Sequence, residues 1–216
     1  MRDTADLIAE IRCLIAVHAR PDARTQVDGL SVAETGSAVL EYGLAEPLLV
    51  VLVQGGERIL LGDNVFEYHA GQCLVVTANL PITGNFRQAT PEFPAMGLSI
   101  ALRPAVIAPL LQEIPSERWK GTPPQPAIAT CDADVDLLDA LARMVRLLDR
   151  PEAISVLAPM IEREVLWRLL TGPLGAMVRQ VGLADSGLSR ISRVIQWIRD
   201  NYTESIRIAD LARLTG

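Results

Sequence analysis

The sequence is poor in aromatic residues and in histidine. Its 216 residues include three Trp, three Tyr, three Phe and only two His. His18 and His69 are too few for the multi-histidine centres of most hydrolytic metalloenzymes, which leaves a carboxylate site as the formal alternative. We therefore expect no resident metal and no cofactor.

Cysteine is also scarce. Cys13, Cys73 and Cys131 lie about 60 residues apart, and no two of them have the spacing of a metal or redox motif. An odd number of isolated thiols is typical of a reducing compartment. The composition therefore predicts a cytoplasmic protein without disulfides.

Long apolar runs are absent, although half of the residues are hydrophobic. The longest run, Leu48 to Val53, is far shorter than the roughly 20 residues that a membrane-spanning helix needs. The amino terminus carries two early acids, Asp3 and Asp6, and no uninterrupted apolar segment follows, which argues against a secretory signal. We expect a soluble globular protein that neither crosses nor binds a membrane.

Charge is distributed unevenly along the chain. The formal net charge is −6, yet residues 179–216 carry six Arg and only four acids. An acidic body is a poor partner for phosphates, whereas a mildly basic terminal segment is compatible with a nucleic-acid-binding module.

Three patterns organise the first hundred residues. Apolar residues at helical spacing predict a helix over Thr4 to His18. Between Leu30 and Leu102, short Val, Leu and Ile runs separated by turn residues predict antiparallel strands in a barrel or sandwich. Leu48 to Val53 has no polar face and predicts a central strand. Small and large residues alternate over Ala95 to Leu102, so the small face accepts either a ligand or, the preferred interpretation, the other sheet.

Helical patterns follow Arg103. A helix starts at Pro104, and a proline-rich loop covers Pro115 to Pro126. Helices over Asp134 to Asp149 and Glu152 to Leu170 are joined by a short link and should form an antiparallel hairpin. We interpret the acids at the start of the first of these helices, Asp132, Asp134 and Asp136, as helix-capping groups rather than a calcium or catalytic cluster.

The last residues have a separate pattern. Residues 182–187 suit a linker, and helices are predicted over Leu188 to Tyr202 and Ile206 to Leu214. Ala212 stands four residues before Gly216, the spacing that a helix-turn-helix uses to place a small residue and a turn glycine.

Several segments together resemble AraC-type bacterial transcription regulators, and most closely those with the N-terminal domain type named after that family. The segments are Pro47 to Gly55, Leu61 to Asp63, Tyr68 to Val76, Val156 to Pro173, Ile195 to Arg199 and Leu211 to Gly216. The Val156 to Pro173 run is the most specific of them.

The resemblance implies an α+β fold, in which a cupin-like antiparallel β-barrel is followed by a helical hairpin subdomain and the first helices of a helix-turn-helix. It divides the chain into a regulatory domain with its helical subdomain (residues 1–181), a linker (182–187) and the start of a DNA-binding domain (188–216). The chain ends inside the first helix-turn-helix, and we expect a truncated regulator. The implied partners are a small-molecule effector, a second copy of the chain, RNA polymerase and, for the full-length protein, promoter DNA.

An enzymatic cupin is the rival interpretation. When the chain is aligned with metal-binding cupins, the positions of their usual histidine ligands fall on Leu74 and near Tyr42 and Leu44. None of these residues is a normal metal ligand. We therefore expect no enzymatic activity. A metal-free cupin-fold module that binds a small molecule remains an alternative to the regulator.

The same register predicts where an effector binds. By strand alternation Leu74, Val76 and Ala78 point into the barrel and join Tyr42, whose phenol would orient a ligand. A filled core is the alternative for these positions. Cys73 then faces away from the barrel, as a buried unreactive thiol or as an electrophile sensor like those of some relatives.

Two further surfaces follow from the patterns. The hairpin helices are apolar enough to predict a dimer, either through a shared face or with the same residues completing the monomer core; the candidates are Leu138, Met144, Val145, Leu166 and Trp167. Five arginines of the terminal helices are expected to contact DNA phosphates without reading bases, or to form a solvated face: Arg190, Arg193, Arg199, Arg207 and Arg213.

Overall fold

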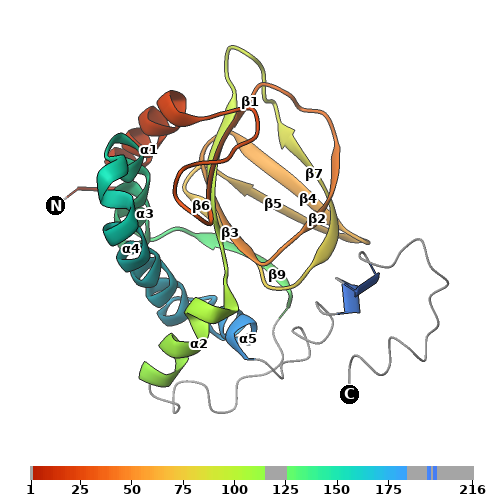
Figure 1. The fold of residues 1–216 in the computed structure, drawn as a ribbon. Coiled ribbons are helices and arrows are strands. Elements are labelled where there is room, and N and C mark those ends of the chain that lie inside the picture. Colours follow the sequence, from red (N-terminus) through yellow and green to blue (C-terminus); the bar gives the residue numbers. More distant parts are fainter. Residues whose placement is uncertain (1, 115–125, 184–193, 196, 199–216) are drawn as a thin grey trace.

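The computed structural model describes residues 2–114, 126–183, 194–195 and 197–198. Two antiparallel sheets face each other, and a layer of helices covers the outer side of one sheet (Figure 1). This arrangement confirms the predicted α+β fold with a cupin-like β-structure, in the form of two open sheets. The described residues 194–195 and 197–198 are helical, but the rest of the predicted terminal helices and their five arginines lie outside the described residues.

The larger sheet contains five strands, in an order that brings distant parts of the chain together. The order is β1 (Leu30–Thr35), β8 (Ala95–Ala101), β3 (Leu48–Gln54), β6 (Gln72–Val76) and β9 (Ile128–Asp132). The predicted central strand is confirmed, because β3 pairs with β8 on one side and β6 on the other.

The smaller sheet contains four strands. Its order is β2 (Glu41–Ala45), β7 (Leu80–Arg87), β4 (Gly56–Leu61) and β5 (Asn64–His69). A two-residue turn joins β4 to β5, and Gly62 in it has a positive φ of 57°, a conformation that glycine adopts without steric cost.

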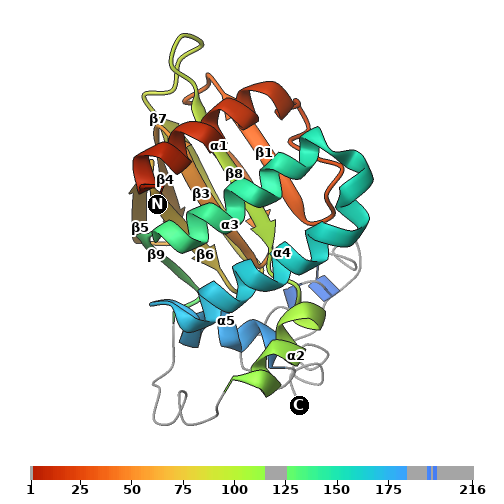
Figure 2. The same cartoon turned by 90° about the vertical axis from the view of Figure 1, so that its left-hand side faces the viewer.

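Helices α1 (Thr4–His18), α3 (Val135–Arg146) and α4 (Pro151–Thr171) lie across the five-stranded sheet (Figure 2). The predicted bounds of α1 are confirmed, and the predicted hairpin appears as α3, a 3₁₀ turn over Leu147–Asp149, and α4. Helices α2 (Pro104–Glu113) and α5 (Gly175–Gly182) pack together beyond one end of the sheet (Figure 2). Within the described ranges, no helix is long and apolar enough to span a bilayer.

The capping interpretation of the acids before α3 is confirmed at Asp134. Its side chain accepts a hydrogen bond from the backbone nitrogen of Leu137 at 2.7 Å, as an N-cap residue does. Asp136 instead accepts from Arg168 of α4 at 2.7 Å, and Asp132 accepts from Gln72 at 2.9 Å.

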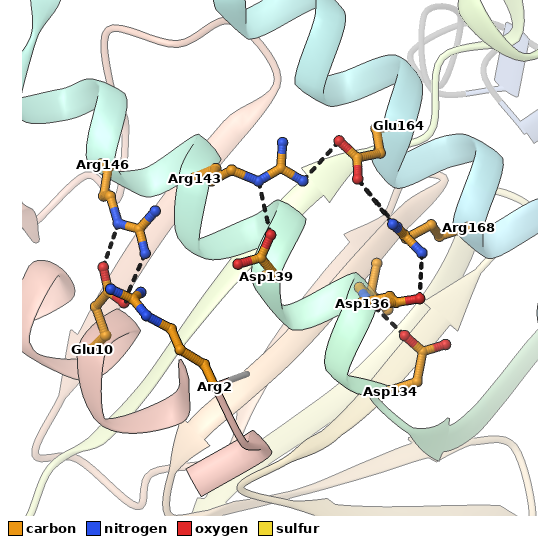
Figure 3. Close-up of polar contacts among 10 residues, drawn as sticks. Arg2, Glu10, Asp134, Asp136, Asp139, Arg143, Arg146, Glu164 and Arg168 are labelled. Carbon is orange, nitrogen blue, oxygen red and sulfur yellow. Dashed lines mark hydrogen bonds and ion pairs between the residues drawn. The ribbon is translucent and has the colours of Figure 1, made fainter. Parts of the chain in front are cut away.

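Ion pairs connect the outer surfaces of the three covering helices (Figure 3). Arg146 of α3 donates to Glu10 of α1 at 2.8 Å, and Arg143 of α3 donates to Glu164 of α4 at 2.7 Å. The hydrogen bond from Arg146 lowers the pKa of Glu10. Solvent-accessible pairs of this kind contribute about 0–1 kcal/mol each, so they add little to the stability of the helical layer.

The main core lies between the helical layer and the five-stranded sheet. The prediction that five hairpin residues form a shared dimer face is wrong for four of them, because they are at most 2% exposed within a single chain. The four are Leu138, Met144, Val145 and Leu166. These side chains complete the monomer core, the alternative that the sequence left open. Trp167, the fifth, is 43% exposed.

Candidate functional site

The inner faces of β1 and β8 are lined by small side chains. Cross-strand partners on this face are Ser31 with Ser99, Ala33 with Gly97, and Thr35 with Ala95. They border a pocket of about 220 Å³, here called the β1–β8 pocket, whose opposite wall comes from the four-stranded sheet. The small face of β8 therefore borders open space, whereas close packing against the other sheet was the preferred interpretation of the sequence.

Strand alternation explains why this space exists. The large residues of β8, Met96, Leu98 and Ile100, belong to the core under the helices and are at most 4% exposed. Because successive side chains point to opposite faces, the small residues between them must face the other sheet. The same strand thus has a filled face and an open face.

A second pocket of about 250 Å³ lies between β2, β7 and β4, and is called the β2–β7 pocket. The two pockets share three lining residues, Leu48, Glu57 and Phe86. The space between the sheets therefore extends on both sides of Glu57.

Glu57 is the acidic group common to the two pockets. Tyr68, its direct cross-strand partner on β5, is fully buried and donates a hydrogen bond from its hydroxyl to the Glu57 carboxylate. Burial raises the pKa of Glu57, the hydrogen bond from Tyr68 opposes that shift, and the nearby charge of Glu41 adds to it. Burial, followed by the charge of Glu57, also raises the pKa of Tyr68.

The structure places the four predicted pocket residues differently from one another. Leu74 and Val76 belong to the apolar cluster between the sheets, and Ala78 is fully buried just after β6. Tyr42 lines the β2–β7 pocket but is 80% exposed. The linings of the two pockets include Tyr42 and not the other three, whose role in ligand binding stays a prediction.

Glu57 and Tyr68 were not among the site residues predicted from the sequence. A signal was present, since Glu57 alternates with the inward-facing residues Ile59 and Leu61 of β4. An acid in register with buried apolar residues is a candidate functional group. Which strand lies opposite, and hence the contact with Tyr68, does not follow from that pattern.

Cys73 faces the helical core, as predicted, and is fully buried. Its sulfur lies 3.0 Å from that of Cys131, the cross-strand partner on β9, and both are free thiols. The hydrogen bond between the two thiols raises the pKa of Cys73, with burial adding to the effect, and lowers the pKa of Cys131. The sequence did not reveal this contact, because the two thiols lie 58 residues apart.

No group of three or more His, Cys, Asp or Glu side chains that could hold a metal ion occurs within residues 2–114 and 126–183 or the few described residues beyond. The arginines expected to contact DNA, which are Arg190, Arg193, Arg199, Arg207 and Arg213, all lie outside the described residues. The candidate site among the described residues is the space between the two sheets, around Glu57.

Comparisons with known proteins agree with the fold. Residues 26–177 match the family model described as the AraC-type transcriptional regulator N-terminus. A search of curated protein sequences found no match.

Among solved structures, the chain is similar to ToxT from Vibrio cholerae. An apo variant has a TM-score of 0.52 at 7% identity, with 87% of this chain and 70% of ToxT covered. ToxT bound to an unsaturated fatty acid has a TM-score of 0.54 at 6% identity, with 84% of this chain and 66% of ToxT covered. ToxT bound to a methylnaphthalenyl butenoic acid has a TM-score of 0.56 at 7% identity, with 84% of this chain and 68% of ToxT covered. At such low identity the likeness concerns the fold, and the chain spans about two thirds of ToxT.

The raised pKa of Glu57 predicts a pH-dependent stability difference. A carboxyl whose folded-state pKa lies above the ordinary 4.5 stabilises the fold at lower pH, and this contribution is lost as pH rises through the raised pKa. Glu57→Gln keeps an oxygen that can accept from Tyr68 but does not titrate. We expect the melting temperature of Glu57→Gln, relative to wild type, to increase as pH rises from 4.5 towards neutrality.

Thermal unfolding of both proteins across this pH range measures the difference. Glu34→Gln, at an exposed position of β1, is the matched control and should show no such trend. A difference for Glu57→Gln that stays constant or decreases with pH would contradict the assignment.

Proposed function

Because the chain belongs to the family of AraC-type transcriptional regulators, with its match in their N-terminal domain, we propose that it is the effector-binding and dimerisation portion of a transcription regulator. A small molecule binds between the two sheets and changes how the DNA-binding domains are presented. The proposal rests mainly on the two adjoining pockets that both border Glu57. The bound acids in the ToxT structures support it, because they show that a protein of similar fold binds small molecules.

The proposed domain boundaries are those predicted from the sequence. Residues 1–181 bind the effector and form the dimer, residues 182–187 are the linker, and residues 188–216 begin the DNA-binding domain. A regulator of this kind would act in the cytoplasm on promoter DNA, with RNA polymerase as a further partner. No enzymatic step is proposed, since the family is one of transcriptional regulators.

Strand β8 supplies a route from the pocket to the helices. Ser99 and Gly97 line the pocket, while Met96 and Ile100 pack beneath the helical layer. An effector changes the protein only through unequal affinity for two of its states. A ligand that favours one position of β8 would therefore also favour one arrangement of the helices that rest on it.

The end of β8 is linked directly to α4. Arg103, two residues after the strand, donates from Nε to Glu162 of α4 at 3.0 Å and makes a second contact with the same carboxylate. It also pairs with Asp28, which lies just before β1. Glu162 is only 7% exposed, so removing its arginine partner would leave a buried charge unpaired. Arg103 thus ties both pocket-lining strands to α4.

A cavity-filling variant distinguishes a ligand that binds in the β1–β8 pocket from one that binds elsewhere. Ser99→Leu adds bulk to the β1–β8 pocket, whereas Ser37→Leu makes the same change at an exposed loop position. A metabolite that binds the folded state raises the melting temperature. We expect a hit from a thermal-shift screen to stabilise wild type and Ser37→Leu but not Ser99→Leu. Equal stabilisation of Ser99→Leu would place the ligand elsewhere.

We also propose that the exposed face of α4 pairs with a second copy of the chain. Val156 and Met160 are each 64% exposed, and Trp167 is 43% exposed. Spacings of four and seven residues place the three side chains on one side of the helix. A two-fold axis beside α4 would bring this stripe against its own copy, since a two-fold dimer uses the same patch on both subunits.

Met160→Glu tests this dimer, because a charge at the centre of an apolar helix contact disfavours association. Val17→Glu, at a 75% exposed position of α1, is the matched control. We expect light scattering at high micromolar concentration to give a dimeric mass for wild type and Val17→Glu and a monomeric mass for Met160→Glu. A monomeric wild type, or a dimer unaffected by Met160→Glu, would contradict the proposal.

A further inference from the structure

The two pockets between the sheets are acidic. Glu57 lines both and Glu41 lines the β2–β7 pocket, while neither lining contains a lysine, arginine or histidine. The remaining lining side chains are apolar, small or uncharged, with the hydroxyls of Ser31, Ser99 and Thr35 on one wall. A ligand in this space therefore meets negative charge without a compensating cation from the lining.

Glu57 differs in its hydrogen-bond donor from other carboxylates in the described part of the chain that are at least partly covered. Glu10, Glu162 and Glu164 each accept a hydrogen bond from an arginine. Glu57 accepts one from the neutral hydroxyl of Tyr68, and among the described residues no basic group lies within ion-pairing distance of it. Its other oxygen, Oε1, lies above Gly84 of β7, 3.1 Å from where a Cβ would stand. The glycine at that position leaves room for the carboxylate.

Aromatic residues stand on both strands next to Glu57. Its cross-strand partner on β5 is Tyr68, and its partner on β7 is Phe86. Both aromatic residues belong to the apolar cluster between the sheets or pack against it, so they share the inner face with Glu57. A carboxylate flanked by aromatic rings is a suitable environment for an organic cation, which gains from both the charge and the ring faces.

From this arrangement we propose that the effector is an organic amine, whose protonated nitrogen binds Glu57 and whose apolar body occupies the space lined by the small residues of β1 and β8. This rests on the proposed function, in which the inter-sheet space is the effector site. An ammonium group supplies the counter-charge that a poorly solvated carboxylate otherwise lacks. A carboxylate ligand, such as the fatty acid of the ToxT complex, would meet the same charge as a repulsion.

Six-carbon probes with different head groups test the proposal. Hexylamine, hexanol and hexanoate each contain six carbons in an unbranched chain and are positive, neutral and negative at neutral pH. Binding to the 216-residue chain is measured by calorimetry and by thermal shift, for wild type, Glu57→Gln and the control Glu34→Gln. We expect hexylamine to bind most tightly and hexanoate least. Glu57→Gln should weaken hexylamine about tenfold or more, the effect of losing a charged hydrogen bond, and Glu34→Gln should leave it unchanged.

Three outcomes would overturn the amine assignment. Hexanoate or hexanol could bind as tightly as hexylamine, Glu57→Gln could bind hexylamine like wild type, or none of the three probes could bind. The variant Ser99→Leu separates this failure from failure of the proposed function. If hexanol or hexanoate binds wild type and is lost from Ser99→Leu, the pocket is the effector site and only the amine preference is wrong. If every ligand found binds Ser99→Leu as it binds wild type, the proposed site itself is wrong.

Discussion

The alternation of small and large side chains along β8 is the constraint on which the rest of the structure depends. Each strand of the five-stranded sheet has one face under the helices and one face towards the other sheet. On β8 the large residues Met96, Leu98 and Ile100 fill the helical side, and the small residues between them leave space on the inner side. One strand therefore shapes the pocket and supports the helices at the same time.

Because β8 contacts both the pocket and the helical layer, binding between the sheets would affect the position of α4. Arg103 holds the end of β8 to Glu162, and Glu162 lies on the same helix as the exposed stripe of Val156, Met160 and Trp167. The helical layer is further tied together by the pairs from Arg146 to Glu10 and from Arg143 to Glu164 (Figure 3). A change in β8 would therefore reach α4 through packed side chains and one partly buried ion pair, and α4 is where we propose that two copies meet. Under this account the effector and the dimer contact are coupled through the same element.

Much of the fold could be predicted from the sequence, because strong local patterns decide it. Helix α1 and strand β3 appear where their periodicity and apolar run placed them. Strand β9 was not predicted: it has five residues, follows a proline-rich stretch and gains its structure from pairing with β6. Helix α5 was missed as well, because the Gly-Pro pair after α4 indicated a stop and nothing local indicated a restart.

The candidate site was harder to predict, because pockets depend on contacts between distant segments. Strand alternation gave the inward direction of Leu74 and Val76, but the open space lies beside β1 and β8 instead. The pairing of Glu57 with Tyr68, and of Cys73 with Cys131, depends on sheet register, which a single sequence does not reveal. The apolar residues of the hairpin likewise could not be divided between core and surface until α3 and α4 were packed on the sheet.

In the proposed function, a ligand between the sheets acts on α4 through β8 and Arg103. Hydrogen–deuterium exchange of the chain, with and without a pocket ligand, measures this effect, because exchange reports the local stability of each element. We expect slower exchange in β1, β8 and Pro151–Thr171 when the ligand is bound, and loss of the α4 effect, but not of the strand effect, in Arg103→Gln. Slower exchange confined to the strands of the wild-type chain would contradict it.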